Sequence, residues 1–123
     1  MSVHINPADV LRRIGQIPIG DPAAMRAHAM RLHHDADELA QLATTASRKA
    51  HSTTFEGPAA DRFRHEIDDC LRDMSARAAH LHRAATNLER AAASVAAAQA
   101  GWRARFRQVE AQLAAAARAA GHG

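Results

Sequence analysis

The feature that most constrains the fold is a row of large apolar side chains that recurs every seven residues through the second half of the chain. Seven residues make nearly two turns of an α-helix, so these side chains line one edge of it. A strict seven-residue repeat predicts left-handed supercoiling against other helices. The row contains Ile67, Met74, Leu81, Leu88, Val95, Trp102 and Val109. A second set of positions beside this row, called the companion positions below, is predicted to face the same neighbours and holds Phe63, Cys70, Ala84, Ala91 and Ala98. Cys70 is therefore expected to be buried and chemically inert.

A second apolar strip lies in the first half of the chain, where the spacing alternates between four and three residues. It begins after Asp21-Pro22, a cap residue followed by proline, which is typical of a helix start. The strip predicts a long helix that packs nearly parallel or antiparallel to its neighbour. It consists of Met25, Ala29, Leu32, Ala36, Leu39, Ala43, Ala46 and Ala50, and Leu42 widens its apolar face.

The segment Phe55-Glu56-Gly57-Pro58 separates the two strips. Gly57 adopts positive φ readily, and Pro58 sets the φ of a first helical turn, where its missing N–H costs nothing. Arg48 and Lys49 lie near the end of the preceding helix and suit its negative dipole end. These signals predict an antiparallel helix-turn-helix hairpin.

A short helix is expected before the hairpin. Asn6 can cap it, Pro7 suits its first position, and Gly15 suits its end.

Gly101 is a candidate break in the second long helix. Trp102 nevertheless stays in phase with Val95, so we expect the helix to continue through Gly101. The helix is then about twice as long as the first one by the usual rise per residue. Its overhang needs cover, which a partner chain, the N-terminal helix or a fold-back at Gly101 would supply.

The composition indicates that one hairpin does not bury its own apolar surface. Apolar residues make up 47% of the chain, but aromatic residues only 3%. Much of the apolar content is alanine, whose side chain buries little area. We therefore predict an all-α protein whose hairpin dimerises into a four-helix bundle. The predicted contact surface is formed by Leu32, Leu39, Ile67, Met74, Leu81, Leu88, Val95 and Trp102.

The turn and the residues after it resemble the signature of the WXG family, which comprises small helical-hairpin substrates of type VII secretion. The family pattern is an aromatic residue, any residue and then glycine, leading into a helix with a small residue and an apolar one. The matching residues are Phe55, Gly57, Pro58, Ala60 and Phe63, with phenylalanine in place of the usual tryptophan. The resemblance divides the chain into an N-terminal extension (1–20), a WXG-like hairpin (21–101) and a C-terminal helical extension with a loose tail (102–123).

Family membership implies a homodimer or heterodimer that is exported from the cytoplasm to the cell surface or medium without a cleaved signal peptide. The implied partners are a copy of the chain, a second WXG-like protein or a larger secreted effector, and the secretion ATPase. The family's export signal is a tyrosine followed four residues later by a carboxylate, and this chain has no tyrosine. Phe106 and Glu110 are the nearest match, although Phe106 also fits the packing seam.

Other functions are weaker matches to the sequence. His65, Asp69 and Asp73 share a helix face, yet ion pairs such as Asp68–Arg72 explain the acids better, so no metal is expected. The other histidines show no ligand spacing. No catalytic motif, cofactor motif, signal peptide or membrane span is recognised, and an enzyme is not expected. Two alternatives stay open: an arginine-rich helical dimer that binds nucleic acid, and a coiled-coil adaptor unrelated to secretion.

Overall fold

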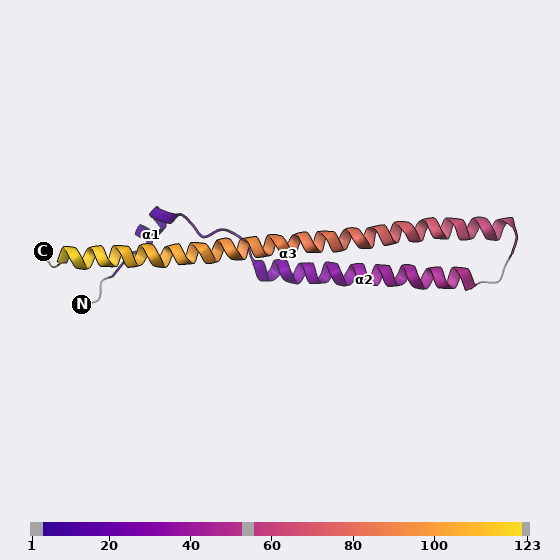
Figure 1. Ribbon diagram of the computed structural model, residues 1–123, viewed down its shortest axis with the longest axis horizontal. Coiled ribbons are helices and arrows are strands. Elements are labelled where there is room, and N and C mark those ends of the chain that lie inside the picture. Colours follow the sequence, from indigo (N-terminus) through magenta and orange to yellow (C-terminus); the bar gives the residue numbers. More distant parts are fainter. Residues whose placement is uncertain (1–3, 53–55, 122–123) are drawn as a thin grey trace. The chain divides into compact units, whose positions relative to one another are not determined.

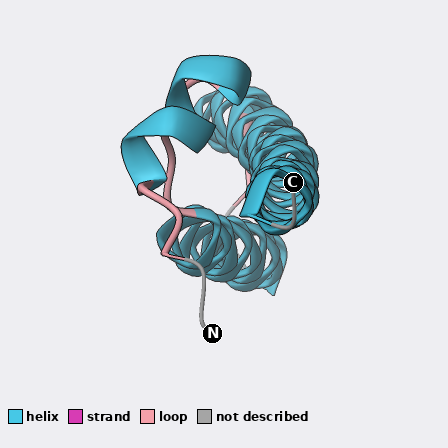
Figure 2. Cartoon of the chain, turned by 90° about the vertical axis from the view of Figure 1, so that its left-hand side faces the viewer, coloured by secondary structure: helices cyan, strands magenta, loops and turns pink. Residues whose placement is uncertain are grey.

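The computed structural model describes residues 4–52 and 56–121, and within these ranges the chain forms three α-helices (Figure 1). They are α1 (Pro7–Ile14), α2 (Pro22–Ser52) and α3 (Pro58–Gly121). The described ranges contain helices and loops but no strand (Figure 2). The prediction of an all-α chain is confirmed.

Capping residues account for both ends of α1 and for the start of α3. The Asn6 side chain accepts a hydrogen bond from the Ala8 N–H at 3.0 Å, and Gly15 ends α1 with φ +78°. Gly57 has φ +113°, and its carbonyl accepts a bond from the Asp61 N–H at 3.0 Å. The predicted positive φ at Gly57 is confirmed, whereas Phe55 lies outside the described residues.

Helix α3 continues through Gly101 as predicted and ends at Gly121. Gly121 is therefore helical and not part of a loose tail. The other two residues assigned to that tail, His122 and Gly123, lie outside the described ranges.

Contacts divide the chain into two compact units. The hairpin unit, Ala23–Ala91, contains nearly all of α2 and the first half of α3. The terminal unit joins the N-terminal segment up to Pro22 to the part of α3 that begins at Ala92.

In the hairpin unit, α2 and α3 lie side by side and antiparallel (Figure 1). Among the described residues of this unit, the buried side chains are all alanines: Ala29, Ala36 and Ala43 from α2, and Ala60, Ala78 and Ala85 from α3. Methyl side chains let two helix backbones approach closely, but each buried methyl group contributes only about 0.8 kcal/mol, against about 1.5 to 3 for a leucine. The packing is therefore close, with a modest hydrophobic contribution.

The predicted strip on α2 faces its neighbour, with two exceptions among the residues assigned to that face: Ala46, and Leu42, which is 61% exposed and does not widen the buried face. Met25, Leu32 and Leu39 are half-buried beside the three buried alanines, whereas Ala46 is exposed.

The predicted companion positions on α3 are wrong. Phe63, Cys70, Ala84, Ala91 and Ala98 are all exposed. The buried alanines lie four residues after the members of the apolar row, not three, as Ala78 follows Met74 and Ala85 follows Leu81. Leu71, not Cys70, faces inward and is half-buried. The expectation that Cys70 is buried is therefore wrong.

In the terminal unit, α1 and the connector after it cover one side of α3. Val10 is fully buried. The Trp102 Nε1–H donates to the Gly15 carbonyl at 2.9 Å, and the Gln99 amide donates to the carbonyls of Pro18 and Gly20 at 3.1 and 2.9 Å. The N-terminal segment, one of the three coverings considered for the overhang, therefore contacts this part of α3.

Candidate functional site

The seven-residue row is intermediate in exposure along its whole length. Its members in the hairpin unit are neither fully covered nor fully exposed, although the alanines beside them are buried. The same holds for Leu32 and Leu39 on α2. At the contact between α2 and α3, the hairpin thus buries alanines and leaves part of each large side chain of the row in contact with solvent.

One hollow of the hairpin unit gathers predicted contact residues from both helices. Leu39 of α2 and Leu81 of α3 line it together, and its volume is about 630 Å³. Ala76 and Ala84 extend its apolar floor, and its charged or titratable rim is formed by Asp73, Arg77 and His80. An apolar strip with a charged border is the usual form of a surface that binds a partner helix.

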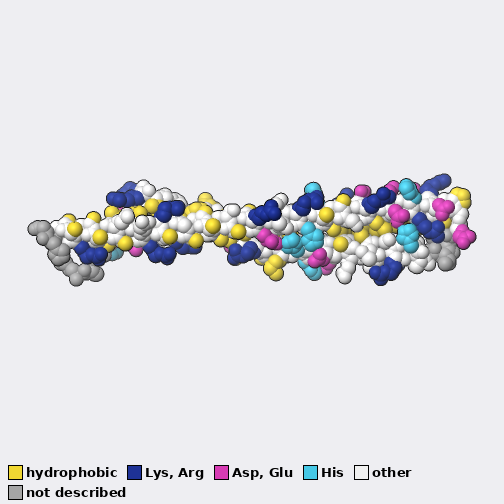
Figure 3. Space-filling model, in the orientation of Figure 1, with side chains coloured by type: hydrophobic (Ala, Val, Ile, Leu, Met, Phe, Trp, Pro, Cys, Tyr) yellow, Lys and Arg dark blue, Asp and Glu magenta, His cyan; other side chains and the backbone are white. Residues whose placement is uncertain are grey.

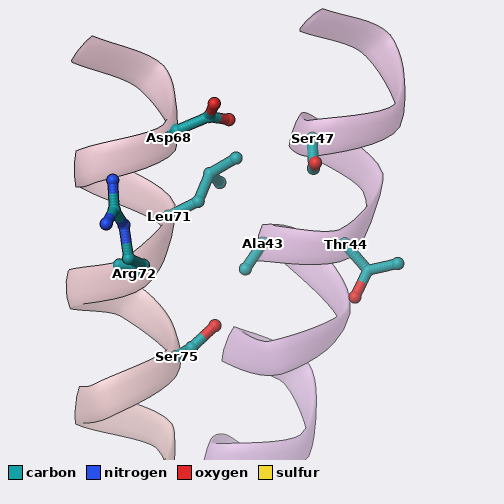
Figure 4. Close-up of a pocket in the computed structure, with 7 residues that line it drawn as sticks. All are labelled: Ala43, Thr44, Ser47, Asp68, Leu71, Arg72 and Ser75. Atoms are coloured by element: carbon teal, nitrogen blue, oxygen red, sulfur yellow. The ribbon is translucent and has the colours of Figure 1, made fainter. Parts of the chain in front are cut away.

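A second hollow, of about 400 Å³, lies nearer the turn and is more polar (Figure 4). Leu71 points from α3 toward α2, where Ala43 and Ser47 lie opposite, while Thr44 points away. Asp68, Arg72 and Ser75 complete the lining. The hollow is open and shows no arrangement of nucleophile and base that would indicate catalysis.

The described part of the turn motif has one buried residue. Ala60 is only 2% exposed, one turn into α3, whereas Phe63 is 45% exposed. The small residue of the motif therefore packs inside the hairpin, and the apolar residue that follows presents part of its ring to solvent.

The candidate export residues lie in the terminal unit. The Phe106 ring lies 5.2 Å from the Trp102 ring, centroid to centroid, at an interplanar angle of 37°. Glu110 is half-buried and lines a hollow with His4, Ile5 and Arg107. The Phe106 ring therefore contacts a neighbouring ring on its own helix.

A polar network in the hairpin unit was not anticipated from the sequence. His33 of α2 and His82 of α3 bring their Nδ1 atoms to within 2.8 Å. The Nε2 atom of His33 lies 2.6 Å from a Glu89 oxygen, and that of His82 lies 3.1 Å from an Asp37 oxygen. Each histidine thus contacts the other histidine and a carboxylate on the opposite helix.

The signal for this network was present but spread over distant parts of the sequence. In an antiparallel hairpin, residue numbers rise along one helix as they fall along the other. His51 pairs with Asp68 at 3.0 Å near the turn, and the same register brings His33 opposite His82. The interpretation that the remaining histidines lack a ligand pattern compared only neighbours within one helix.

The surface charges show a second correction. Asp68 is engaged by His51 across the hairpin, and Arg72 donates to Asp69 at 2.7 Å. The predicted pair Asp68–Arg72 is therefore replaced by these two contacts. On the face shown in Figure 3, histidine and acidic side chains gather over the hairpin unit.

Within the described ranges, no group of three or more histidine, cysteine or carboxylate side chains is arranged to hold a metal ion. His65, Asp69 and Asp73, the set weighed from the sequence, form no such group. In the same ranges, no helix combines the length and the apolarity that crossing a bilayer requires. Comparisons of the chain with protein-family models, curated proteins and solved structures find no match.

Proposed function

We propose that this chain is a non-enzymatic binding protein whose hairpin pairs with a second helical hairpin to form a four-helix bundle. The observation that carries the proposal is the division of apolar side chains in the hairpin unit. Alanines fill the contact between α2 and α3, whereas the leucines of the row remain half-buried. A second hairpin packed on this face would remove the remaining apolar surface of the leucines from water.

The occupant to which the proposal commits is a second copy of this chain. The residues that line the hollow with Leu39 and Leu81 include the acidic Asp73 as well as Arg77 and His80, all from one face of α3. A surface that carries both signs of charge is self-complementary when two copies meet about a twofold axis. The same surface would also accept a related hairpin with a similar rim.

The test is sedimentation of the full chain together with two matched variants. Leu81→Gln places an amide in the hollow and should convert the dimer to monomer. Met30→Gln makes a similar change on α2 at a residue that is 72% exposed and does not line the hollow, and it should leave the dimer intact. A monomeric parent chain at about 100 μM, well above the micromolar range of weak stable pairs, would contradict self-pairing.

We further propose that the protein is a substrate or targeting partner of type VII secretion, as the WXG resemblance implies. Support comes from the positive φ of Gly57 and from the burial of Ala60 just after the turn. The test is export of the full chain from a bacterium that carries the secretion apparatus, compared with a strain that lacks the apparatus ATPase. Equal amounts outside the two strains would contradict this assignment.

Nucleic-acid binding is the alternative with an observation in its favour. Arg103, Arg105 and Arg107 are all exposed on α3 in the terminal unit. Binding of duplex DNA that weakens steeply with added salt would support this alternative, whereas a binding curve unaffected by replacing all three arginines with glutamine would exclude it.

A further inference from the structure

Four side chains form a continuous chain of contacts between α2 and α3. His33 Nε2 lies 2.6 Å from a Glu89 oxygen, and the Nδ1 atoms of His33 and His82 lie 2.8 Å apart. His82 Nε2 lies 3.1 Å from an Asp37 oxygen. Each of the three contacts crosses from one helix to the other, and each is within hydrogen-bond range. We call these four side chains the histidine network.

The three contacts need more protons than two neutral imidazole rings carry. A hydrogen bond places one proton between its two heavy atoms, so three contacts need three protons. An ionised carboxylate only accepts, whereas a neutral imidazole donates through one nitrogen and accepts through the other. The two histidines therefore supply two protons for three contacts. In the neutral network, one contact must join two atoms that both present a lone pair, which is repulsive.

Moving the two protons does not remove this repulsion. If both Nε2 atoms hold them, the two Nδ1 atoms face each other with lone pairs. If one ring carries its proton on Nδ1 instead, its Nε2 lone pair faces an ionised carboxylate. One additional proton satisfies all three contacts, because an imidazolium donates through both of its nitrogens. A further proton would point two Nδ1–H groups at each other, so the network is complete with one additional proton and not with two.

We propose that His33 and His82 together bind one proton that fastens α2 to α3, which makes the stability of the hairpin depend on pH near neutrality. Histidine is the side chain whose ordinary change of charge falls between about pH 5 and 8. The two rings are 33% and 41% exposed, so the proton exchanges with solvent. The site lies within one hairpin and does not rest on the pairing of two hairpins proposed above.

Charged groups from both helices face the pair. Asp37 of α2 and Glu89 of α3 contact it directly and favour the added positive charge. Arg83 and Arg90 of α3 line a hollow of about 290 Å³ beside one of the two rings and oppose that charge. Arg83 itself donates to His80 Nδ1 at 2.7 Å. Because the carboxylates lie in direct contact, at 2.6 and 3.1 Å, we expect their attraction to exceed the repulsion from the arginines.

The direction of the pH dependence follows from the protons bound by the folded and the unfolded chain. In the unfolded chain the two imidazoles are each half protonated at about pH 6.5, so together they hold one additional proton, as many as the network. Above that pH the unfolded chain holds fewer protons than the folded one, so stability falls as the pH rises. Below that pH the unfolded chain holds more, so stability falls as the pH falls. The contribution of the network is therefore largest at about pH 6.5.

Glu89→Gln tests the proton count, because a glutamine amide donates where a carboxylate only accepts. The amide then donates to His33 Nε2, and two neutral rings satisfy the other two contacts without a third proton. Urea denaturation of the full chain, followed by circular dichroism, gives folding constants from about pH 6 to about pH 9. The ratio of the parent constant to the variant constant should fall as the pH rises, by up to about tenfold per unit. At the alkaline end of the range, the variant should be more stable than the parent chain.

Glu38→Gln is the matched control. Glu38 contacts His34 at 3.0 Å on its own helix, and the two side chains are 62% and 71% exposed. The same substitution there should leave the folding constant within about twofold of the parent value at each pH. His82→Asn is a second check, since its amide both donates and accepts without taking up a proton. In that background, Glu89→Gln should no longer gain stability over its own parent as the pH rises.

Nitrogen-15 NMR of labelled histidines reads the protons directly. In the parent chain at neutral pH, the Nε2 atoms of His33 and His82 should both carry a proton, and their Nδ1 atoms should share one. In Glu89→Gln, the proton of His33 should move from Nε2 to Nδ1. Two results would overturn the site: an unprotonated Nε2 on either ring of the parent chain, or a parent chain that exceeds Glu89→Gln in stability by the same factor at every pH.

Discussion

Helix α3 is covered in two different ways along its length. In the hairpin unit its neighbour is another helix, and the contact consists of buried methyl groups with histidine–carboxylate pairs at its edge. In the terminal unit its neighbours are a two-turn helix and an extended connector. There, Trp102 and Gln99 donate hydrogen bonds to connector carbonyls.

This difference shows what a seven-residue repeat specifies and what it leaves open. The row runs without interruption from Ile67 through Leu88 in one unit and from Val95 through Val109 in the other. The repeat therefore predicts that one edge of the helix is covered. It does not predict whether a helix or a connector covers this edge, because that depends on segments outside the helix. The connector residues bonded to Gln99, for example, lie 81 and 79 positions before it in the sequence.

The largest expected effect comes from enlarging a methyl group inside the helix contact. Ala85→Leu adds three carbon atoms at a fully buried position, so α2 and α3 must separate or the side chain must adopt a strained conformation. We expect a loss of about 3 kcal/mol in the free energy of unfolding, at the upper end of typical overpacking costs. Urea denaturation followed by circular dichroism measures it.

Ala79→Leu is the control for that change, since Ala79 lies on the same helix but is exposed. Its effect should stay within about 0.5 kcal/mol, as is usual for surface substitutions. Equal losses in the two variants would mean that the spacing of the helices does not depend on the buried alanines.

A smaller effect is expected where the connector approaches α3. A Cβ atom on Gly20 would lie 2.7 Å from Val95 Cγ1, and Gly20 has φ +149°. The β-branched Val95 has little freedom to turn away. Gly20→Ala should therefore cost about 2 kcal/mol, from steric overlap together with an unfavourable φ.

Gly15→Ala separates these two causes. Gly15 also has positive φ, +78°, but nothing lies within 4 Å of a Cβ atom placed on it. It should show the backbone cost of about 1 kcal/mol alone. If denaturation gives equal losses for both variants, the contact between the connector and Val95 contributes nothing.

The elements themselves were predictable because their signals are local. Asn6, Gly15, Gly57 and Pro58 each act on the residues next to them. Helix α1 begins and ends, and helix α3 begins, where these residues require it. Local signals also sufficed for Gly101, because the phase of the apolar row continues through it.

The detailed contacts were not predictable in the same way. Cys70 and Leu71 both fit a spacing of three or four from the row, and only the position of α2 decides that Leu71 faces inward. The approach of His33 to His82 depends on a register between residues 49 apart, which no local spacing contains. The exposure of the residues on the candidate partner surface was unpredictable for the same reason, because it depends on which side of α3 is occupied by α2.

The smallest effect tests whether side-chain bonds to the connector hold the terminal unit together. Gln99→Ala removes two hydrogen bonds, to Pro18 and Gly20. Each is worth about 0.5 to 1.5 kcal/mol where water is excluded, and water can replace part of that at this half-buried residue. A net loss of about 1 kcal/mol should therefore favour release of the connector about fivefold.

Trypsin reports this release, because Arg12 and Arg13 lie in α1, just before the connector. Their cleavage should be about fivefold faster in Gln99→Ala, in proportion to the open population when reclosing is fast. Gln108→Ala is the control, since Gln108 lies on the same helix and is exposed. If both variants are cleaved at the parental rate, the connector is held by the burial of Val10 and not by the glutamine. Apolar burial would then be the main contact of α3 in the terminal unit, as it is in the hairpin unit.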